Sequence, residues 1–178
     1  IQSDPDYPLF VCPSQLKLMA IEQELSGENN PGYFLYEALE SVQDDFDYIV
    51  IDTQPNLNLM TRSALIASDT VVIPQALEKF AAECLSLSYD CIEGVRKAQR
   101  YIDADIKTIK ILPVMFERNR ILGDAYLKAI REGYREDVSE HYISRAAAVA
   151  QVYSTPGAKL SEGMKAYGEY ASFVDQLI

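Results

Sequence analysis

The sequence has few of the residues that metal sites and disulfide frameworks use. It contains one histidine, His141, and three cysteines, which lack the spacing of metal ligands. An odd number of thiols in apolar segments predicts that Cys12, Cys84 and Cys91 are buried and reduced, as in a cytoplasmic protein. No cysteine or carboxylate is arranged near His141 for metal binding, so we expect an ordinary surface or edge residue there.

Long hydrophobic runs and excess positive charge are also missing. No apolar run approaches the length of a membrane span, so we expect no membrane insertion. The 178 residues include 16 Lys and Arg against 27 Asp and Glu, a formal net charge of −11. This charge argues against general nucleic-acid binding, so any DNA contact has to come from a local basic patch. The length suffices for a substantial core, and we expect one domain over residues 1–178.

The most informative stretch is residues 47–55, where a short Ile/Val run ends at Asp52. Such a run, bounded by turn residues, predicts a strand that is buried on both faces of a parallel sheet. Ligands of α/β sheets bind outside the carboxyl ends of the strands, where Asp52 would stand. A buried carboxylate needs a cation or hydrogen-bond donors. Asp52 is therefore either a Walker B-type aspartate, which holds Mg²⁺ through water, or a cap of the next turn.

Strands and helices alternate along the whole chain, which predicts an α/β fold with parallel crossovers. In the longest predicted helix, Cys84 and Cys91 fall on the apolar face, which favours core positions for both. The predicted strands cover residues 9–12, 47–51, 69–74, 107–114 and 138–143. The predicted helices cover residues 14–27, 34–42, 57–67, 78–101, a stretch ending near 136, 146–150 and 160–177.

The stretch around Asp52 resembles the ParA/Soj/MinD family of deviant Walker A ATPases, most closely the ParA-type partition proteins. The family has an apolar strand, Asp-Thr or Asp-Cys, two prolines, a helix and an Ala-Asp…Ile-Pro strand. Residues 48–55 and 65–74 follow this signature, with Gln54 in place of the first proline. The resemblance covers almost the whole chain. It implies a P-loop NTPase-like parallel sheet flanked by helices, incomplete at the N-terminus.

Two later segments are similar to parts of the family that lie beside the nucleotide. Residues 112–117 resemble its strand with a Thr-Met-Phe/Tyr-Asp/Glu element, which implies that Met115 and Phe116 border the base. Residues 143–146 lie where the family has Ile-Pro-Arg-Asn/Ser, with Ser144 in place of the proline and Ala146 in place of the asparagine. The resemblance implies that these two residues also border the base; the two departures argue against side-chain contacts there and leave backbone contacts open.

The resemblance also implies a catalytic role for Asp52, which would bind Mg²⁺ through water. The arginine of the family's Ile-Pro-Arg element touches DNA, which assigns that role to Arg145. A second DNA-contacting arginine of the family falls near Asn119, between Arg118 and Arg120. The alternative for these two arginines is a solvated loop.

Two elements of the family are missing from this sequence, the phosphate-binding loop and the Asp-rich switch segment after the family's second strand. Its phosphate-binding loop is rich in glycine and contains a lysine, whereas none of the eight glycines here directly precedes a lysine. We therefore expect either the C-terminal portion of a longer ATPase, inactive alone, or a degenerate relative without catalysis.

In the first case the resemblance implies an ATP- and Mg²⁺-dependent homodimer in the cytoplasm, associated with the nucleoid. The dimer would bind DNA non-specifically and would respond to a centromere-binding partition protein during plasmid or chromosome segregation. The alternatives are a non-catalytic interaction module and a MinD-like positioning ATPase. MinD-type proteins end in a basic amphipathic helix, and the polar face of the last predicted helix is not basic, which argues against a membrane partner.

Overall fold

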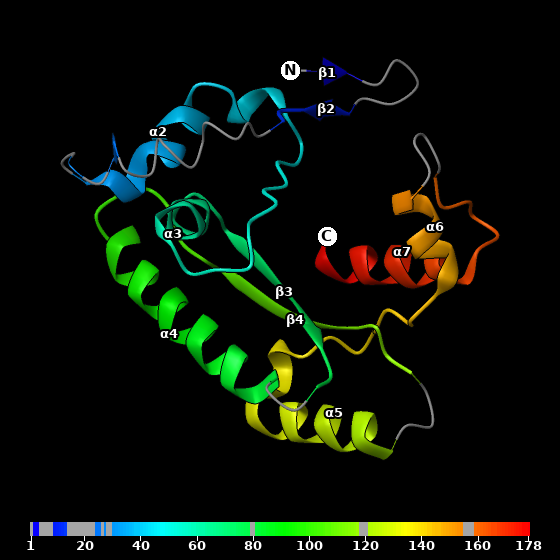
Figure 1. Ribbon diagram of the computed structural model, residues 1–178. Helices are drawn as coiled ribbons and strands as arrows, with labels where there is room; N and C mark the ends of the chain where they lie inside the picture. The colour runs from blue at the N-terminus through cyan, green and yellow to red at the C-terminus, as the bar shows by residue number, and fades with distance from the viewer. Residues whose placement is uncertain are drawn as a thin grey trace. The chain divides into compact units, whose positions relative to one another are not determined.

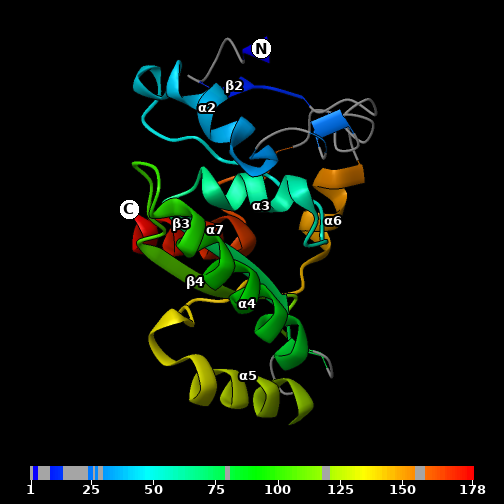
Figure 2. The same cartoon turned by 90° about the vertical axis from the view of Figure 1, so that its left-hand side faces the viewer.

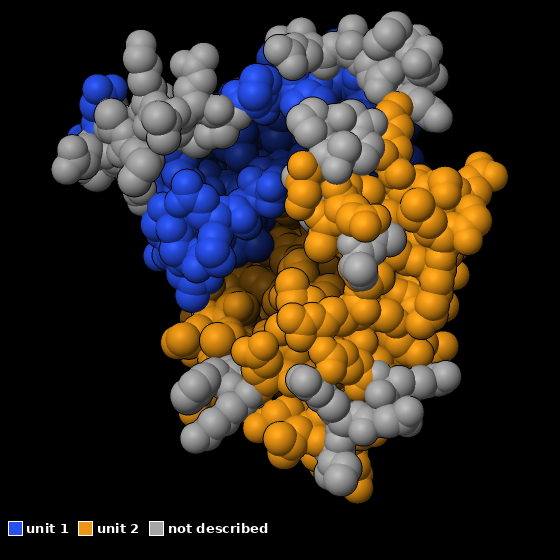
Figure 3. Space-filling model, turned by 45° about the vertical axis from the view of Figure 1, so that its right-hand side comes forward, with its two compact units in different colours: residues 1–67 blue, residues 68–178 orange. Residues whose placement is uncertain are grey.

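The computed structural model divides the chain into two compact units, residues 1–67 and 68–178, which Figure 3 shows in different colours. It describes residues 2–3, 9–13, 24–25, 27, 30–78, 81–117, 121–154 and 159–178. Of the helix predicted over residues 14–27, the structure describes only residues 24 and 25, which are helical, and residue 27, which lies in a turn.

The first unit consists of a small hairpin and a group of short helices. Strand β1 (Gln2–Ser3) pairs antiparallel with β2 (Phe10–Val11), a pairing that the sequence did not predict. The helices are η1 (Pro31–Tyr33), α2 (Phe34–Glu40), η2 (Gln43–Asp45) and α3 (Leu59–Ile66), and α2 and α3 confirm two predicted helices.

Helix α3 begins where the local sequence can cap it. The side chain of Asn58 accepts a hydrogen bond of 3.1 Å from the backbone N–H of Thr61, which satisfies one of the free donors of the first turn. At its other end, α3 approaches η1 closely. A Cβ on Gly32 would lie 3.0 Å from Cδ1 of Ile66, so a larger residue there would force a shift.

The prediction of a buried strand over residues 47–51 is wrong for this structure. Residues 48–51 have no regular secondary structure, and the side chains of Tyr48 and Val50 are 66% and 92% exposed. A strand buried in a sheet needs neighbours that satisfy its N–H and C=O groups. Within the part of the chain that the structure describes, no strand pairs with residues 48–51, so this apolar run stays in contact with water.

The second unit is built on a parallel pair of strands. Strand β3 (Thr70–Ala76) and strand β4 (Thr108–Val114) are joined by helix α4 (Ala81–Gln99) and pair in register over seven residues each, with Ile73 opposite Ile111. These elements confirm the strand–helix–strand prediction. The remaining elements are α5 (Ile121–Tyr134), η3 (Arg135–Asp137), α6 (Ala147–Ser154) and α7 (Lys165–Leu177).

Helices cover both faces of this sheet, as Figures 1 and 2 show, with α4 on one face and α7 on the other. Ile111 packs toward the α4 side with Leu85 and Ile130. The next residue of β4, Leu112, packs toward α7 with Phe173. Successive residues of a strand point to opposite faces, so the apolar run of β4 contributes to two core clusters. The predicted parallel sheet flanked by helices is confirmed.

Residues 138–145 continue the sheet beyond β4. Two isolated parallel bridges join Ile111 to Val138 and Phe116 to Ser144. Between the bridges the pairing is irregular, because the N–H of Ser139 donates to Ile111 and that of Ile143 donates to Pro113, so that four steps along the segment match two along β4. The edge strand predicted over residues 138–143 is therefore present as irregular pairing and not as a continuous strand.

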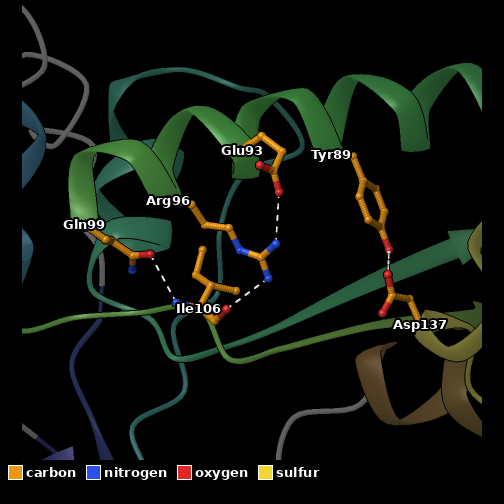
Figure 4. Close-up of polar contacts among 6 residues, drawn as sticks. All are labelled: Tyr89, Glu93, Arg96, Gln99, Ile106 and Asp137. Carbon is orange, nitrogen blue, oxygen red and sulfur yellow. Dashed lines mark hydrogen bonds and ion pairs between the residues drawn. The ribbon is translucent and has the colours of Figure 1, made fainter.

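Polar contacts fix α4 to the rest of the second unit, as Figure 4 shows. The Tyr89 hydroxyl donates to Oδ2 of Asp137 at 2.7 Å. Burial, and then this hydrogen bond, raise the pKa of Tyr89, so it stays a neutral donor. At the end of the helix, Arg96 donates to the carbonyl of Ile106 at 3.0 Å, and the buried Gln99 accepts from the N–H of Ile106 at 3.1 Å.

The thiols are less buried than their segments predict. Cys12 and Cys84 are exposed and Cys91 is half-buried, so the prediction of buried cysteines is wrong for the first two. Cys84 lies in the first turn of α4, while Leu85 beside it is fully buried. Cys12 directly follows β2, whose residues are themselves about half exposed.

Candidate functional site

The carboxyl end of β4 brings together two segments that lie 26 or more residues apart in the sequence. The N–H of Phe116 donates to the carbonyl of Ile143 at 3.0 Å, and the N–H of Arg145 donates to the carbonyl of Phe116 at 3.1 Å. These bonds extend the parallel pairing past the end of β4. Ligand sites of α/β folds lie at this end of the strands, so residues 115–117 and 143–146 form the candidate site of the second unit.

The residues of the first segment differ in what they expose. Met115 has a backbone φ of 54° and a side chain that is 67% exposed. Positive φ is uncommon outside glycine, and here it occurs where the chain leaves β4. Phe116 is 7% exposed, and its ring packs edge-on against Tyr142 with centroids 4.7 Å apart. A ligand at this site would therefore meet the side chain of Met115 but only the backbone of Phe116.

The second segment is held by helix α7. The N–H of Ser144 donates to Oε2 of Glu169 at 2.7 Å, and its hydroxyl donates to Oε1 at 2.6 Å. Lys165 donates to the same hydroxyl at 3.0 Å and lies 3.1 Å from Oε1 of Glu169. The side chain of Ser144 is thus fully engaged. Its carbonyl has no hydrogen-bond partner within the described ranges, and the next residue but one, Ala146, is half-buried.

The charge of Glu169 is stabilised by these contacts. Burial alone raises the pKa of this carboxyl, whose side chain is 14% exposed. The hydrogen bonds from Ser144 and Lys165, together with the charge of Lys165, outweigh burial, so the net effect lowers its pKa. Glu169 is therefore ionised at neutral pH, as an acceptor of three hydrogen-bonding groups should be.

Glu169 and Lys165 are the residues of this site that the sequence analysis missed. Their spacing of four residues on a helix is a recognisable ion-pair signal. That signal gives no hint of Ser144, which lies 25 residues from Glu169 along the chain.

Arg145, the predicted DNA contact, is engaged with a carboxylate. Its Nη1 lies 2.9 Å from Oε1 of Glu117, and the two side chains are 67% and 31% exposed. An ion pair this open to water stabilises by only about 0–1 kcal/mol, so an incoming anion can compete for the guanidinium. Arg118 and Arg120 lie outside the described residues.

Asp52 belongs to the first unit and is exposed, in a stretch without regular structure. Among the described residues, no group of three or more His, Cys, Asp or Glu side chains could together hold a metal ion. Asp52 thus offers a single carboxylate, which fits a Mg²⁺ ion held mostly by water and phosphate oxygens. His141 likewise belongs to no such group.

Comparisons with known proteins decide the family. The family described as an AAA domain matches residues 1–108. The sporulation initiation inhibitor protein Soj of Bacillus subtilis is 33% identical over 146 residues, which cover 82% of this chain and 56% of Soj. The chain belongs to the ParA/Soj family. The match spans little more than half the length of Soj.

Solved structures agree with ParA/Soj membership at the level of the fold. Cobyrinic acid a,c-diamide synthase from Mycobacterium smegmatis superposes with a TM-score of 0.76 at 23% identity, over 93% of this chain and 60% of that one; it was also solved with a bound ATP analog and magnesium. A putative plasmid partition protein from Borrelia burgdorferi B31, bound to AMPPNP, gives a TM-score of 0.75 at 22% identity, over 93% and 62%. The P-loop NTPase-like fold is thereby confirmed.

No helix within the described part of this ParA/Soj chain is long and apolar enough to cross a membrane.

Proposed function

We propose that the protein carrying this sequence is a ParA-type ATPase of DNA partitioning. In this proposal ATP and Mg²⁺ drive formation of a homodimer that binds DNA non-specifically, and a centromere-binding partition protein stimulates hydrolysis. The observation that carries the proposal is the pairing of residues 115–117 with residues 143–146 at the carboxyl end of β4, in a chain of the ParA/Soj family. The cargo would be a plasmid or chromosome, and the protein would act at the nucleoid in the cytoplasm.

The roles of the site residues follow from their chemistry. Asp52 would hold Mg²⁺ through water, and the metal would supply charge stabilisation to the transferred phosphoryl group. Met115 would contact the base with its side chain, whereas Phe116, Ser144 and Ala146 would border it with backbone atoms. Support comes from solved structures of the same fold, described as bound to AMPPNP or to an ATP analog and magnesium.

The phosphate contacts have to come from elsewhere in the full-length protein, because no glycine here directly precedes a lysine. We therefore expect residues 1–178 alone to be inactive. We also propose that both units described above belong to one ATPase domain in the complete protein.

DNA binding would use a local basic patch in an otherwise acidic protein. Arg145 is the candidate whose environment is described, and Arg118 and Arg120 complete the proposed patch. Because the ion pair of Arg145 with Glu117 is exposed and weak, exchange of this carboxylate for a DNA phosphate costs little.

The proposal is tested by DNA binding of the full-length protein with and without ATP and Mg²⁺, at several salt concentrations. A partition ATPase of this kind binds DNA of unrelated sequences when ATP is present, and the affinity falls as salt rises. Binding that does not depend on ATP, or the absence of binding at low salt, would contradict the proposal and favour an interaction module.

A further inference from the structure

Helix α7 runs along the segment that carries the base side of the proposed nucleotide site. Glu169 binds Ser144, and seven residues later Gln176 accepts a hydrogen bond of 2.9 Å from the Ser139 hydroxyl. Seven residues are two helical turns, so both anchors project from one side of α7. The order of the contacts shows that α7 and residues 139–144 run in opposite directions, side by side (Figure 1).

The anchor at Ser144 is the stronger of the two. Glu169 accepts from both the backbone N–H and the hydroxyl of Ser144, at 2.7 and 2.6 Å. Hydrogen bonds to an ionised acceptor are shorter and stronger than bonds between neutral groups, and a bidentate pair also fixes orientation. Lys165 balances the charge from one turn away on α7, at 3.1 Å from Oε1 of Glu169. Residue 144 has no proline ring to restrict its backbone, and its parallel bridge to Phe116 is isolated, so the bonds to Glu169 add to the backbone bonds of the residues on either side.

The same two bonds control what Ser144 offers to a ligand. They engage its N–H and its hydroxyl, whereas its carbonyl has no hydrogen-bond partner among the described residues. A carbonyl is an acceptor, which suits the exocyclic amino group of adenine and does not suit the exocyclic oxygen of guanine. Glu169 thus helps to position this edge, together with the backbone bonds to residues 113 and 116, and it occupies the two donors of Ser144.

We propose that Glu169 is a positioning residue that presets the edge at residues 143–146 for an adenine base by binding the amide and hydroxyl of Ser144. This inference rests on the proposed function. It assigns to the last helix a role in nucleotide selection, although Glu169 itself touches no nucleotide.

The expected effect follows from preorganisation. If the edge occupies its binding geometry only about a tenth of the time once Glu169 is removed, the apparent Kd for ATP rises about tenfold. Inorganic tripolyphosphate has no base, so its binding depends on the phosphate contacts and stays unchanged. In the Glu169→Ala variant, the affinity for GTP relative to that for ATP is expected to rise, because the freed N–H of Ser144 can donate to a guanine oxygen.

The experiment measures Kd values for ATP, GTP and tripolyphosphate in the full-length protein carrying Glu169→Ala, Glu169→Gln or Asp175→Ala. Asp175 is an exposed carboxylate of the same helix and serves as the matched control. Glutamine keeps an acceptor for the amide and a donor for the hydroxyl, so Glu169→Gln restores most of the ATP affinity. Hydrogen exchange at the Ser144 amide provides a second readout, since Glu169→Ala removes its protection.

A tenfold weaker Kd for ATP in Glu169→Ala, with tripolyphosphate binding unchanged and Glu169→Gln close to wild type, supports the inference. Equal loss of ATP and tripolyphosphate binding, or no loss of either, overturns it, because the residue would then act on folding alone or not at all. A wild-type protein that binds no ATP overturns the proposed function itself. This result can be told apart from a failure of the Glu169 inference, because it is seen in wild type before any variant is compared.

Discussion

The ion pair between Arg145 and Glu117 predicts opposite changes in DNA affinity when one or the other partner is substituted. With side-chain exposures of 67% and 31% and a separation of 2.9 Å, the pair stabilises by about 0.2–1 kcal/mol. A DNA phosphate that replaces Glu117 has to overcome this energy. Glu117→Gln should therefore strengthen ATP-dependent DNA binding by up to about fivefold, since 1.4 kcal/mol corresponds to a factor of about ten. Arg145→Ala should weaken it and lower the salt slope by about 0.9 for the lost phosphate contact.

The assay is the affinity of the full-length protein for duplex DNA at four or more salt concentrations, in the presence of ATP and Mg²⁺. Two exposed residues of α4 provide controls with the same change of net charge: Lys97→Ala for Arg145→Ala, and Glu83→Gln for Glu117→Gln. The reasoning is refuted if Arg145→Ala and Lys97→Ala give the same salt slope. It is also refuted if Glu117→Gln strengthens binding no more than Glu83→Gln does, because net charge alone would then explain the effect.

Three further predictions concern stability, each measured as the free energy of unfolding in urea. Gln99→Met fills the same space but leaves the N–H of Ile106 without its acceptor, so we expect a loss of about 1–3 kcal/mol. Lys97→Ala is the control, and a Gln99→Met protein within about 0.5 kcal/mol of it would contradict this expectation. Leu85→Ala should lower the free energy of unfolding by about 2–5 kcal/mol. Cys84→Ala, at the exposed neighbouring position, should lower it by less than about 0.5 kcal/mol. Equal losses would contradict the assignment of Leu85 to the buried face of α4. The folded-state pKa of Glu169 is lowered from 4.5, so its contribution is fully present above pH 4.5 and is lost as the pH falls through the folded value. The stability difference between wild type and Glu169→Gln should therefore shrink on acidification, and a constant difference would contradict the ionised contact.

The sequence predicted those parts of the fold that local pattern and nearby partners determine. The strand–helix–strand unit from Thr70 to Val114 was found because both strands are apolar runs and each pairs with the other. The run at residues 48–51 is also apolar, yet it is not a strand, because no described strand satisfies its backbone groups. An apolar run can therefore form a strand, but it does so only where another strand satisfies its backbone N–H and C=O groups.

The candidate site, too, was predictable from the sequence only in part. The likeness to the ParA family selected residues 115–116 and 144–146, and the structure brings these two segments together at one strand end. The hydrogen bonds that organise them come from Glu169 and Lys165, whose contact with Ser144 depends on how α7 packs through Phe173. The sequence predicts a helix over residues 160–177, but it does not say which loop lies beside that helix.

The decisive experiment measures ATP turnover by the full-length protein with Mg²⁺ and DNA present. It compares wild type, Asp52→Ala and Asp47→Ala, the last being a control at another exposed carboxylate of the same stretch. We expect hydrolysis by wild type and by Asp47→Ala, and no hydrolysis above the buffer rate by Asp52→Ala. Normal turnover by Asp52→Ala, or no turnover by wild type, would contradict this expectation.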